Sequence, residues 1–162
     1  MEKNLQKAMN EQIRNELYSA YLYLSMAAYC ESKNLSGIAH WLKVQAKEEV
    51  SHAMKFFEFM VDVGAEITLL AIDQPPTDFA SVTEIFEKTL EHEKKVTAMI
   101  NNLVSLAQKA GDNPAMIMLQ WFVNEQVEEE KNASQILETL KMIKEQGPAI
   151  VMLDRELGKR EG

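Results

Sequence analysis

Residues 38–60 read IAHWLKVQAKEEVSHAMKFFEFM, a segment whose apolar residues recur every three or four positions, as on one face of an α-helix. Glu49 lies in the middle of that apolar face, and His52 follows it by three residues. A carboxylate is expected among apolar side chains only where something positive lies beside it. The apolar residues of this face are Ile38, Leu42, Ala46, Ala53, Phe56 and Met60.

The same placement of polar residues occurs twice along the chain. An interval of 33 residues separates Glu16 from Glu49, and the same interval separates Glu93 from Gln126. Each second member begins a pair of potential ligands three residues apart, so one half of the chain repeats the other. These pairs are Glu49/His52 and Gln126/Glu129. Because all of these residues lie on apolar stripes, the pattern indicates a metal site buried in a helical bundle.

Three further segments have helical spacing: residues 2–32, 82–107 and 119–143. In the first of them the predicted core stripe consists of Leu5, Met9, Ile13, Leu17, Ala20, Leu24 and Ala27. Residues that favour helix starts precede the other helices. The expected starts are Ser36 for the second helix, Ser81 with Glu84 for the third, and Asp112 or Asn113 followed by Pro114 for the fourth.

The connections between the helices predict their arrangement. Short links around residues 33–35 and 111–113 make each flanking pair an antiparallel hairpin. Residues 64–80 have no helical stripe, and extended at roughly 3.3 Å per residue they could reach about 55 Å. A 28-residue helix needs only about 42 Å. We therefore expect an all-α four-helix bundle with one long crossover that makes the second and third helices parallel.

The C-terminal segment follows Gly147 and Pro148 and carries the apolar residues Ile150, Val151, Leu153 and Leu157. It predicts a short fifth helix over residues 149–157, packed on this bundle or on a neighbouring subunit; a frayed helix end is the alternative. One domain is expected, with the four-helix bundle in residues 1–145 and the short helix and tail in residues 146–162.

Composition narrows the class of protein. A chain of 162 residues with 46% hydrophobic residues can bury a substantial core. A formal charge of −8 without a basic cluster argues against nucleic-acid binding. Cys30 is the single cysteine, so no internal disulfide can form. No secretory leader and no apolar run of membrane-spanning length is visible, and we expect a cytoplasmic protein without membrane contact.

The buried acids favour metal binding. Glu16, Glu49, Glu93 and Gln126 lie near the midpoints of their helices, and midpoints share one level in an aligned bundle. Three carboxylates at one level repel each other unless they are protonated or a cation is present. The stripes contain no Lys or Arg to neutralise them. A structural bundle with protonated or water-paired acids remains the competing interpretation.

Carboxylate oxygens and one imidazole, without thiolates, suit Fe, Mn or Mg. We assign Glu16, Glu49 and His52 to one ion, and Glu49 with Glu93 to a second ion, with Gln126 close to it. The amide in the fourth helix makes the two positions unequal.

Other residues near this level have further expected roles. Acidic residues of the fourth helix lie at i, i+3 and i+4 and could form a third, looser metal position with an acid of the second helix. Tyr23 could hydrogen-bond a ligand carboxylate or give up an electron, or it could simply pack in the core. Trp121 is expected to pack, His40 to lie on the surface, and His92 to lie beside the metal site without binding the ion. The residues of the possible third site are Glu48, Glu125, Glu128 and Glu129.

Four separated motifs together resemble the signature segments of non-haem ferritins from bacteria and archaea. They are NELYSAYLY at residues 15–23, EEVSHA at 48–53, EHE at 91–93 and LQWFVNEQVEEE at 119–130. The resemblance extends to Pro75-Pro76 in the crossover and to LDREL at residues 153–157. It implies the ferritin-like fold, in which two hairpins are joined by one long crossover.

The resemblance also implies a function. The protein is expected to oxidise Fe(II) with O₂ or peroxide at a di-iron ferroxidase centre, and to store ferric mineral in a hollow shell of 24 identical subunits. The ligands, the third site and Tyr23 match the family's positions as assigned above. Val50 stands where bacterioferritins carry a haem-binding Met, so haem is not expected. The alternative is a rubrerythrin-like oxidase or peroxidase that stores nothing, although Gln126-x-x-Glu129 departs from the second Glu-x-x-His of that class.

Overall fold

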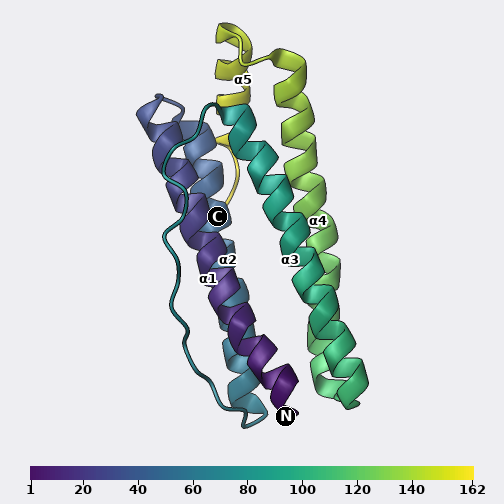
Figure 1. Ribbon diagram of the computed structural model, residues 1–162. Helices are drawn as coiled ribbons and strands as arrows, with labels where there is room; N and C mark the ends of the chain where they lie inside the picture. The colour runs from purple at the N-terminus through teal and green to yellow at the C-terminus, as the bar shows by residue number, and fades with distance from the viewer.

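The computed structural model describes residues 1–162 and contains five helices and no strand (Figure 1). The helices are α1 (Lys3–Ser32), α2 (Ser36–Asp62), α3 (Val82–Ala110), α4 (Asn113–Ile143) and α5 (Gly147–Leu157). The all-α fold expected from the sequence is therefore confirmed. None of these helices combines the length and the apolar character that crossing a bilayer would require.

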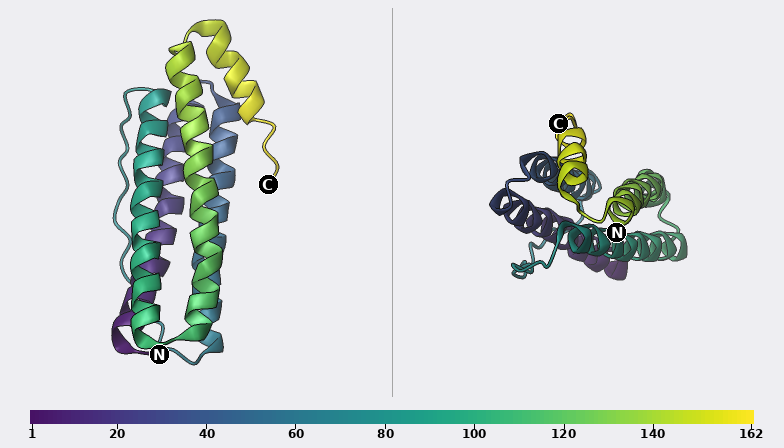
Figure 2. Two further views of the ribbon diagram at one scale, coloured as in Figure 1. Left: turned by 90° about the vertical axis from the view of Figure 1, so that its right-hand side faces the viewer. Right: turned by 90° about the horizontal axis from the view of Figure 1, so that it is seen from above.

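The two hairpins lie side by side and are joined by a crossover that runs the length of the bundle (Figures 1 and 2). The crossover occupies residues 63–81, between the end of α2 and the start of α3. At one end, the amide of Asn10 donates to Glu66 O at 3.0 Å and its oxygen accepts from Thr68 N at 2.8 Å. At the other end, Ser25 Oγ donates to Pro76 O at 2.5 Å. These contacts hold the crossover against α1.

The helix starts agree with the sequence in two cases and differ in one. Ser81 accepts a hydrogen bond from Glu84 N at the start of α3, and Asp112 accepts one from Ala115 N at the start of α4. The expected cap by Ser36 is wrong, because Ser36 is already the first helical residue of α2. The Asp154 carboxylate of α5 accepts instead from Ile38 N at 2.8 Å. A distant side chain thus satisfies a free N–H group at this helix start.

Helix α5 lies against α2 of its own bundle, which is the first of the two surfaces expected for it. Its residues Ile150, Leu153 and Leu157 pack against the hydrophobic core. The helix begins at Gly147, two residues before the expected start, because Pro148 fits the first helical turn, where no N–H is needed. Gly37 makes the close approach possible, since a Cβ there would lie 1.8 Å from Asp154 O.

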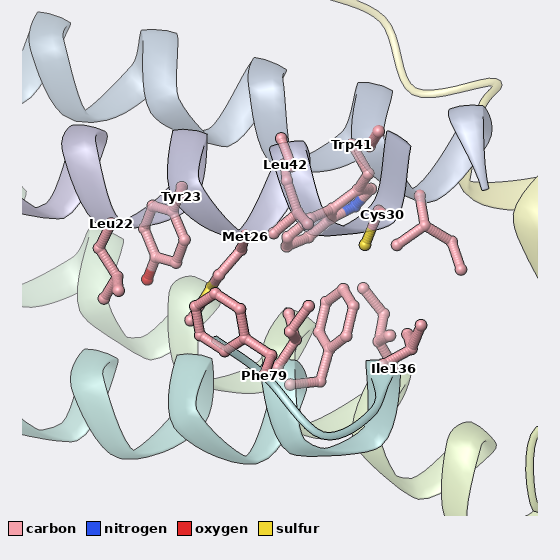
Figure 3. Packing of buried hydrophobic residues seen from close by; sticks show 14 of the residues in the cluster. Leu22, Tyr23, Met26, Cys30, Trp41, Leu42, Phe79 and Ile136 are labelled. Atoms are coloured by element: carbon pink, nitrogen blue, oxygen red, sulfur yellow. The ribbon is translucent and has the colours of Figure 1, made fainter. Parts of the chain in front are cut away.

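The hydrophobic core is divided into two clusters. One surrounds Tyr23, Met26, Trp41 and Phe86 near α5, and Figure 3 shows part of it. The other lies near the opposite end of the bundle and includes Phe56. Leu24, placed on the core stripe by the sequence, is 49% exposed. At 100° per residue it points about 80° away from Glu16, at the edge of the buried face.

We predict that Gly37→Ala destabilises the protein by about 1–3 kcal/mol, because the added methyl group forces α5 away from α2. Chemical denaturation followed by circular dichroism measures this. Gly147→Ala is the matched control, since a Cβ at Gly147 meets nothing within 4 Å. Equal stability of the two variants would contradict the close packing of α5.

Candidate metal centre

A layer of polar side chains lies between the two hydrophobic clusters, halfway along the bundle. Each of the four long helices contributes to it, as the midpoint argument requires. Its ionisable and amide groups are almost completely buried. The exposed fractions are 1% for Glu16, 2% for Glu49, 5% for His52, 2% for Glu93, 3% for Gln126 and 6% for Glu129.

Two groups of potential ligands share one carboxylate. Ligand atoms of Glu16, Glu49 and His52 lie within 4.8 Å of one another, and so do those of Glu49, Glu93 and Glu129. Glu49 belongs to both groups, which is the position required of a bridging ligand. The structure therefore brings together the residues that the sequence assigned to two ions, and it adds Glu129 to the second group.

One atom of the layer lacks a partner. Glu16 Oε2 is buried and accepts no hydrogen bond. Its nearest cationic atom is Nδ1 of His52 at 3.8 Å, which is too long for a hydrogen bond. Leaving a buried charged oxygen unsatisfied costs more than 1 kcal/mol, roughly. A cation among Glu16, Glu49 and His52 would satisfy this atom, so the donor set fits a metal ion.

Three glutamine amides satisfy most of the other carboxylate oxygens. Gln12 donates to Glu16 at 2.9 Å, and Gln45 donates to Glu49 at 3.0 Å and to Glu129 at 2.6 Å. Gln126 donates to the second carboxylate oxygen of Glu93 at 3.1 Å.

Gln12 and Gln45 were not identified from the sequence, although a signal existed. Each precedes a ligand carboxylate by four residues, and they are separated by 33 residues, the same interval as Glu16 and Glu49. Side chains at i and i+4 lie on the same face of a helix, so each amide can reach the carboxylate that follows it.

The charge of His52 depends on two neighbouring acids. Burial acts to lower the pKa of His52, but the carboxylates of Glu16 and Glu49 outweigh it and raise that pKa to about 11. Nδ1 of His52 lies 3.1 Å from Glu49 Oε2. Burial acts to raise the pKa of Glu16, yet His52 and Glu49 together lower it below its usual value. Without a metal ion, the imidazolium is thus the one full positive charge among these ligands.

The remaining carboxyl groups retain protons more readily than usual. Burial raises the pKa of Glu93 to about 7 and that of Glu129 to about 8. Burial also raises the pKa of Glu49 well above its usual value. Protons and amide hydrogens therefore compensate for the repulsion among the acids when no cation is bound.

Tyr23 and His92 lie on the side of the layer formed by α1 and α3. The hydroxyl of Tyr23 donates a hydrogen bond to Glu93, and burial raises the pKa of this tyrosine well above its usual value. Figure 3 shows its hydroxyl pointing into the bundle. His92 Nε2 lies 2.7 Å from Ser19 Oγ, and burial lowers the pKa of His92 to about 4. His92 belongs to neither ligand group.

The four acids expected at the third metal position do not form one group. Glu125 and Glu129 lie with His52 within 4.8 Å, and Glu125 Oε1 is 4.0 Å from His52 Nε2. Glu128 is exposed, and Glu48 pairs with Arg160 at 3.1 Å. The patch predicted from spacing is divided because Glu129 turns inward while Glu128 faces away.

Two aromatic side chains complete the surroundings. Trp121 packs edge-on against the His52 ring, with ring centroids 5.5 Å apart, as expected of a packing residue. The expectation of a surface position for His40 is wrong, because it is half-buried and its Nε2 lies 2.7 Å from Arg160 O. The C-terminal tail covers it, which spacing along α2 could not predict.

Two antiparallel helical hairpins, one long crossover and a buried layer of carboxylates with an imidazole define a ferritin-like bundle. Comparison with known proteins agrees: the family model described as a ferritin-like domain matches residues 6–143. The chain therefore belongs to the ferritin family.

Individual relatives match the chain over nearly its whole length. A probable bacterial non-heme ferritin-like protein of Haemophilus influenzae is 39% identical over 158 residues, covering 98% of this chain and 96% of the relative. A bacterial non-heme ferritin of Staphylococcus aureus is 36% identical over 160 residues, covering 99% and 96%. Among solved structures, an open pore ferritin from Archaeoglobus fulgidus is 43% identical, with a TM-score of 0.98 and coverage of 99% and 98%. Iron storage is the function that this similarity and the buried Glu/His groups support.

We predict that the cation-free protein loses stability as the pH rises from about 6.5 to about 8. Glu93, Glu129 and His52 have raised pKa values in the folded state, so the folded protein binds more protons than the unfolded chain in this range. His92 has a lowered pKa in the folded protein and therefore makes stability rise with pH. This opposite effect falls mainly below about pH 6.5, where the His92 imidazole is charged in the unfolded chain. Close to two extra protons on the folded protein give an expected decrease of roughly 2 kcal/mol per pH unit.

Denaturant midpoints in the presence of a chelator measure this slope. Glu129→Gln is the matched variant, because it removes one of the raised groups and should reduce the slope. Stability that increases with pH over this range would contradict the assigned protonation.

Proposed function

We propose that this protein oxidises Fe(II) at the buried layer and stores the ferric product inside a shell of identical subunits. The shared position of Glu49 between two ligand groups is the observation that supports this most strongly. Two Fe(II) ions, as substrate, would bind to Glu16, Glu49 and His52 on one side and to Glu49 and Glu93 on the other. Carboxylate and imidazole ligands suit iron, and the unpartnered oxygen of Glu16 gains a cation.

The proximity of two binding positions explains the reaction. Each Fe(II) gives up one electron, so a pair can reduce O₂ to peroxide by two electrons, with two protons taken up. Because both ions are already held side by side, O₂ need not meet a second Fe(II) ion from solution, and this proximity speeds the reaction. Negative ligands favour the ferric product electrostatically.

Proton release accompanies the binding of cations in this proposal. His52 must lose its proton to ligate a metal ion, and so must any protonated carboxyl group among Glu49, Glu93 and Glu129. Iron binding is therefore expected to weaken as the pH falls.

The second iron position should hold its ion less firmly than the first. Gln126 directs its NH₂ group at Glu93, and its other amide atom is a neutral oxygen. A neutral amide is a weaker iron ligand than a carboxylate, which favours movement of the ferric product out of the layer.

Two neighbouring features have proposed supporting roles. Tyr23, through its hydrogen bond to Glu93, orients a ligand and is placed to supply an electron. A third iron is proposed beside His52, Glu125 and Glu129. Glu48 and Glu128 are the further acids that the resemblance to non-haem ferritins assigns to this position.

Storage requires an assembly with a cavity. We propose 24 identical subunits and a cytoplasmic location. A rubrerythrin-like enzyme without a shell would perform similar chemistry. That class carries a second Glu-x-x-His motif in the fourth helix, where this chain has Gln126 and Glu129.

Replacing the shared carboxylate should abolish rapid oxidation. Glu49→Ala and the isosteric Glu49→Gln remove the ligand common to both positions, and the initial rate of aerobic Fe(II) oxidation should fall at least about tenfold. Absorbance of the ferric product measures the rate. Glu91→Gln, which changes an exposed acid on α3, is the control and should retain the wild-type rate. Wild-type oxidation by the Glu49 variants would refute the assignment.

Native mass spectrometry should distinguish storage from oxidation alone. The metal-free protein is expected as a particle of 24 subunits that gains many iron atoms per subunit after aerobic loading. A monomer or dimer that oxidises iron but gains only the few ions of its binding layer would contradict storage and favour the non-storage alternative.

A further inference from the structure

The C-terminal tail turns back from α5 and follows α2 toward the metal centre (Figures 1 and 2). Asp154 binds the start of α2 through Ile38 N, and Arg160 O accepts from the half-buried His40 side chain. Gly162 packs against Val44, since a Cβ there would lie 2.8 Å from Val44 Cγ1. The tail is therefore fixed along the two turns of α2 that precede Glu49 and His52.

Arg160 makes four interactions at the edge of the polar layer. Its Nη1 donates to Trp41 O at 3.1 Å, and its guanidinium lies 4.3 Å from the centroid of the Trp41 ring. Its Nη2 donates to Gln45 Oε1 at 3.0 Å and lies 3.1 Å from Glu48 Oε2. The side chain is only 18% exposed. The guanidinium is therefore a well-held positive charge rather than a freely moving surface arginine.

This contact determines which way the Gln45 amide points. Arginine has donors and no acceptor, so the oxygen of Gln45 must face Arg160. The NH₂ group of Gln45 consequently faces the other way, and its hydrogens go to Glu49 and Glu129. Arg160 thereby places donors on two carboxylates that a metal ion would need, and it occupies Glu48 directly.

We propose that Arg160 acts as a latch, meaning that its guanidinium takes the place of a cation at the Glu48 and Glu129 side of the metal centre and is displaced when a cation binds there. This inference rests on the proposed function, since it requires that the layer binds cations. The outer position is the ligand group formed by His52, Glu125 and Glu129. A cation that binds there competes with the guanidinium for Glu48 and is repelled by its charge. Binding at this outer position therefore releases the Arg160 side chain and frees the Gln45 amide to rotate its oxygen toward the ion.

Helix α5 stays in place when the latch opens. Its attachment depends on Asp154 at the start of α2 and on apolar packing by Ile150, Leu153 and Leu157, none of which involves Arg160. The Arg160 side chain is thus the part of the subunit that responds to an ion at the outer position.

The test uses Zn²⁺, which binds to carboxylate and imidazole ligands without changing its oxidation state. Isothermal titration of the assembled, metal-free protein gives the number and affinity of bound ions. Arg160→Gln should bind the outermost Zn²⁺ about tenfold more tightly than wild type, because a nearby positive charge is gone. Arg155→Gln removes the same charge from the exposed side of α5 and should leave that affinity unchanged.

A second measurement follows the latch itself. The only tryptophans are Trp41 and Trp121, so a Trp121→Phe background leaves Trp41, beneath the guanidinium, as the single reporter. Zn²⁺ at the outer position should shift Trp41 emission to longer wavelength in this background, as Arg160 leaves and water reaches the ring. The shift should be absent when Arg160→Gln is added.

The outcomes separate the latch from the proposed function. Wild-type protein that binds no Zn²⁺ in the layer would overturn both. Normal uptake with equal affinities in wild type and Arg160→Gln would overturn the latch alone. Weaker binding in Arg160→Gln, or equal tightening in Arg155→Gln, would also overturn it, since the first shows that Arg160 supports the site and the second that only net charge matters.

Discussion

The structure depends on the burial of acidic side chains between two apolar clusters. Glu16, Glu49, Glu93 and Glu129 meet where the hydrophobic core is interrupted, and each buried carboxylate costs several kcal/mol unless it is compensated. A bundle selected for stability alone would fill this layer with apolar residues. The arrangement of the four long helices, and of the crossover that sets α2 parallel to α3, brings these acids to one level.

The negative charge of the buried acids is compensated by different groups when no cation is bound than when one is. The imidazolium of His52, retained protons on Glu93 and Glu129, and hydrogens of three glutamine amides satisfy the acids when no ion is bound. Only one oxygen of Glu16 remains without a partner. These protons can leave and these amides can rotate when a cation binds, so the layer can stay folded without iron and still accept it. A site that releases its product needs such replaceable partners.

Much of the fold and of the site could be predicted from the sequence, because both depend on local periodicity. The interval of 33 residues placed Glu16 beside Glu49 and Glu93 beside Gln126, and the length of the crossover fixed the topology. What spacing could not supply were contacts between distant segments. Asp154 replaces Ser36 at the start of α2, and the tail covers His40 and brings Arg160 to Gln45. Glu128 and Glu129 separated because adjacent helical residues point about 100° apart.

Anomalous diffraction from crystals soaked with Zn²⁺ or with anaerobic Fe(II) locates bound ions independently of any reaction. Two strong peaks are expected inside the bundle, one among Glu16, Glu49 and His52 and the other between Glu49 and Glu93. The carboxylate of Glu49 should lie between the two peaks. Ions found only on exposed acids, with the polar layer unchanged, would contradict this expectation.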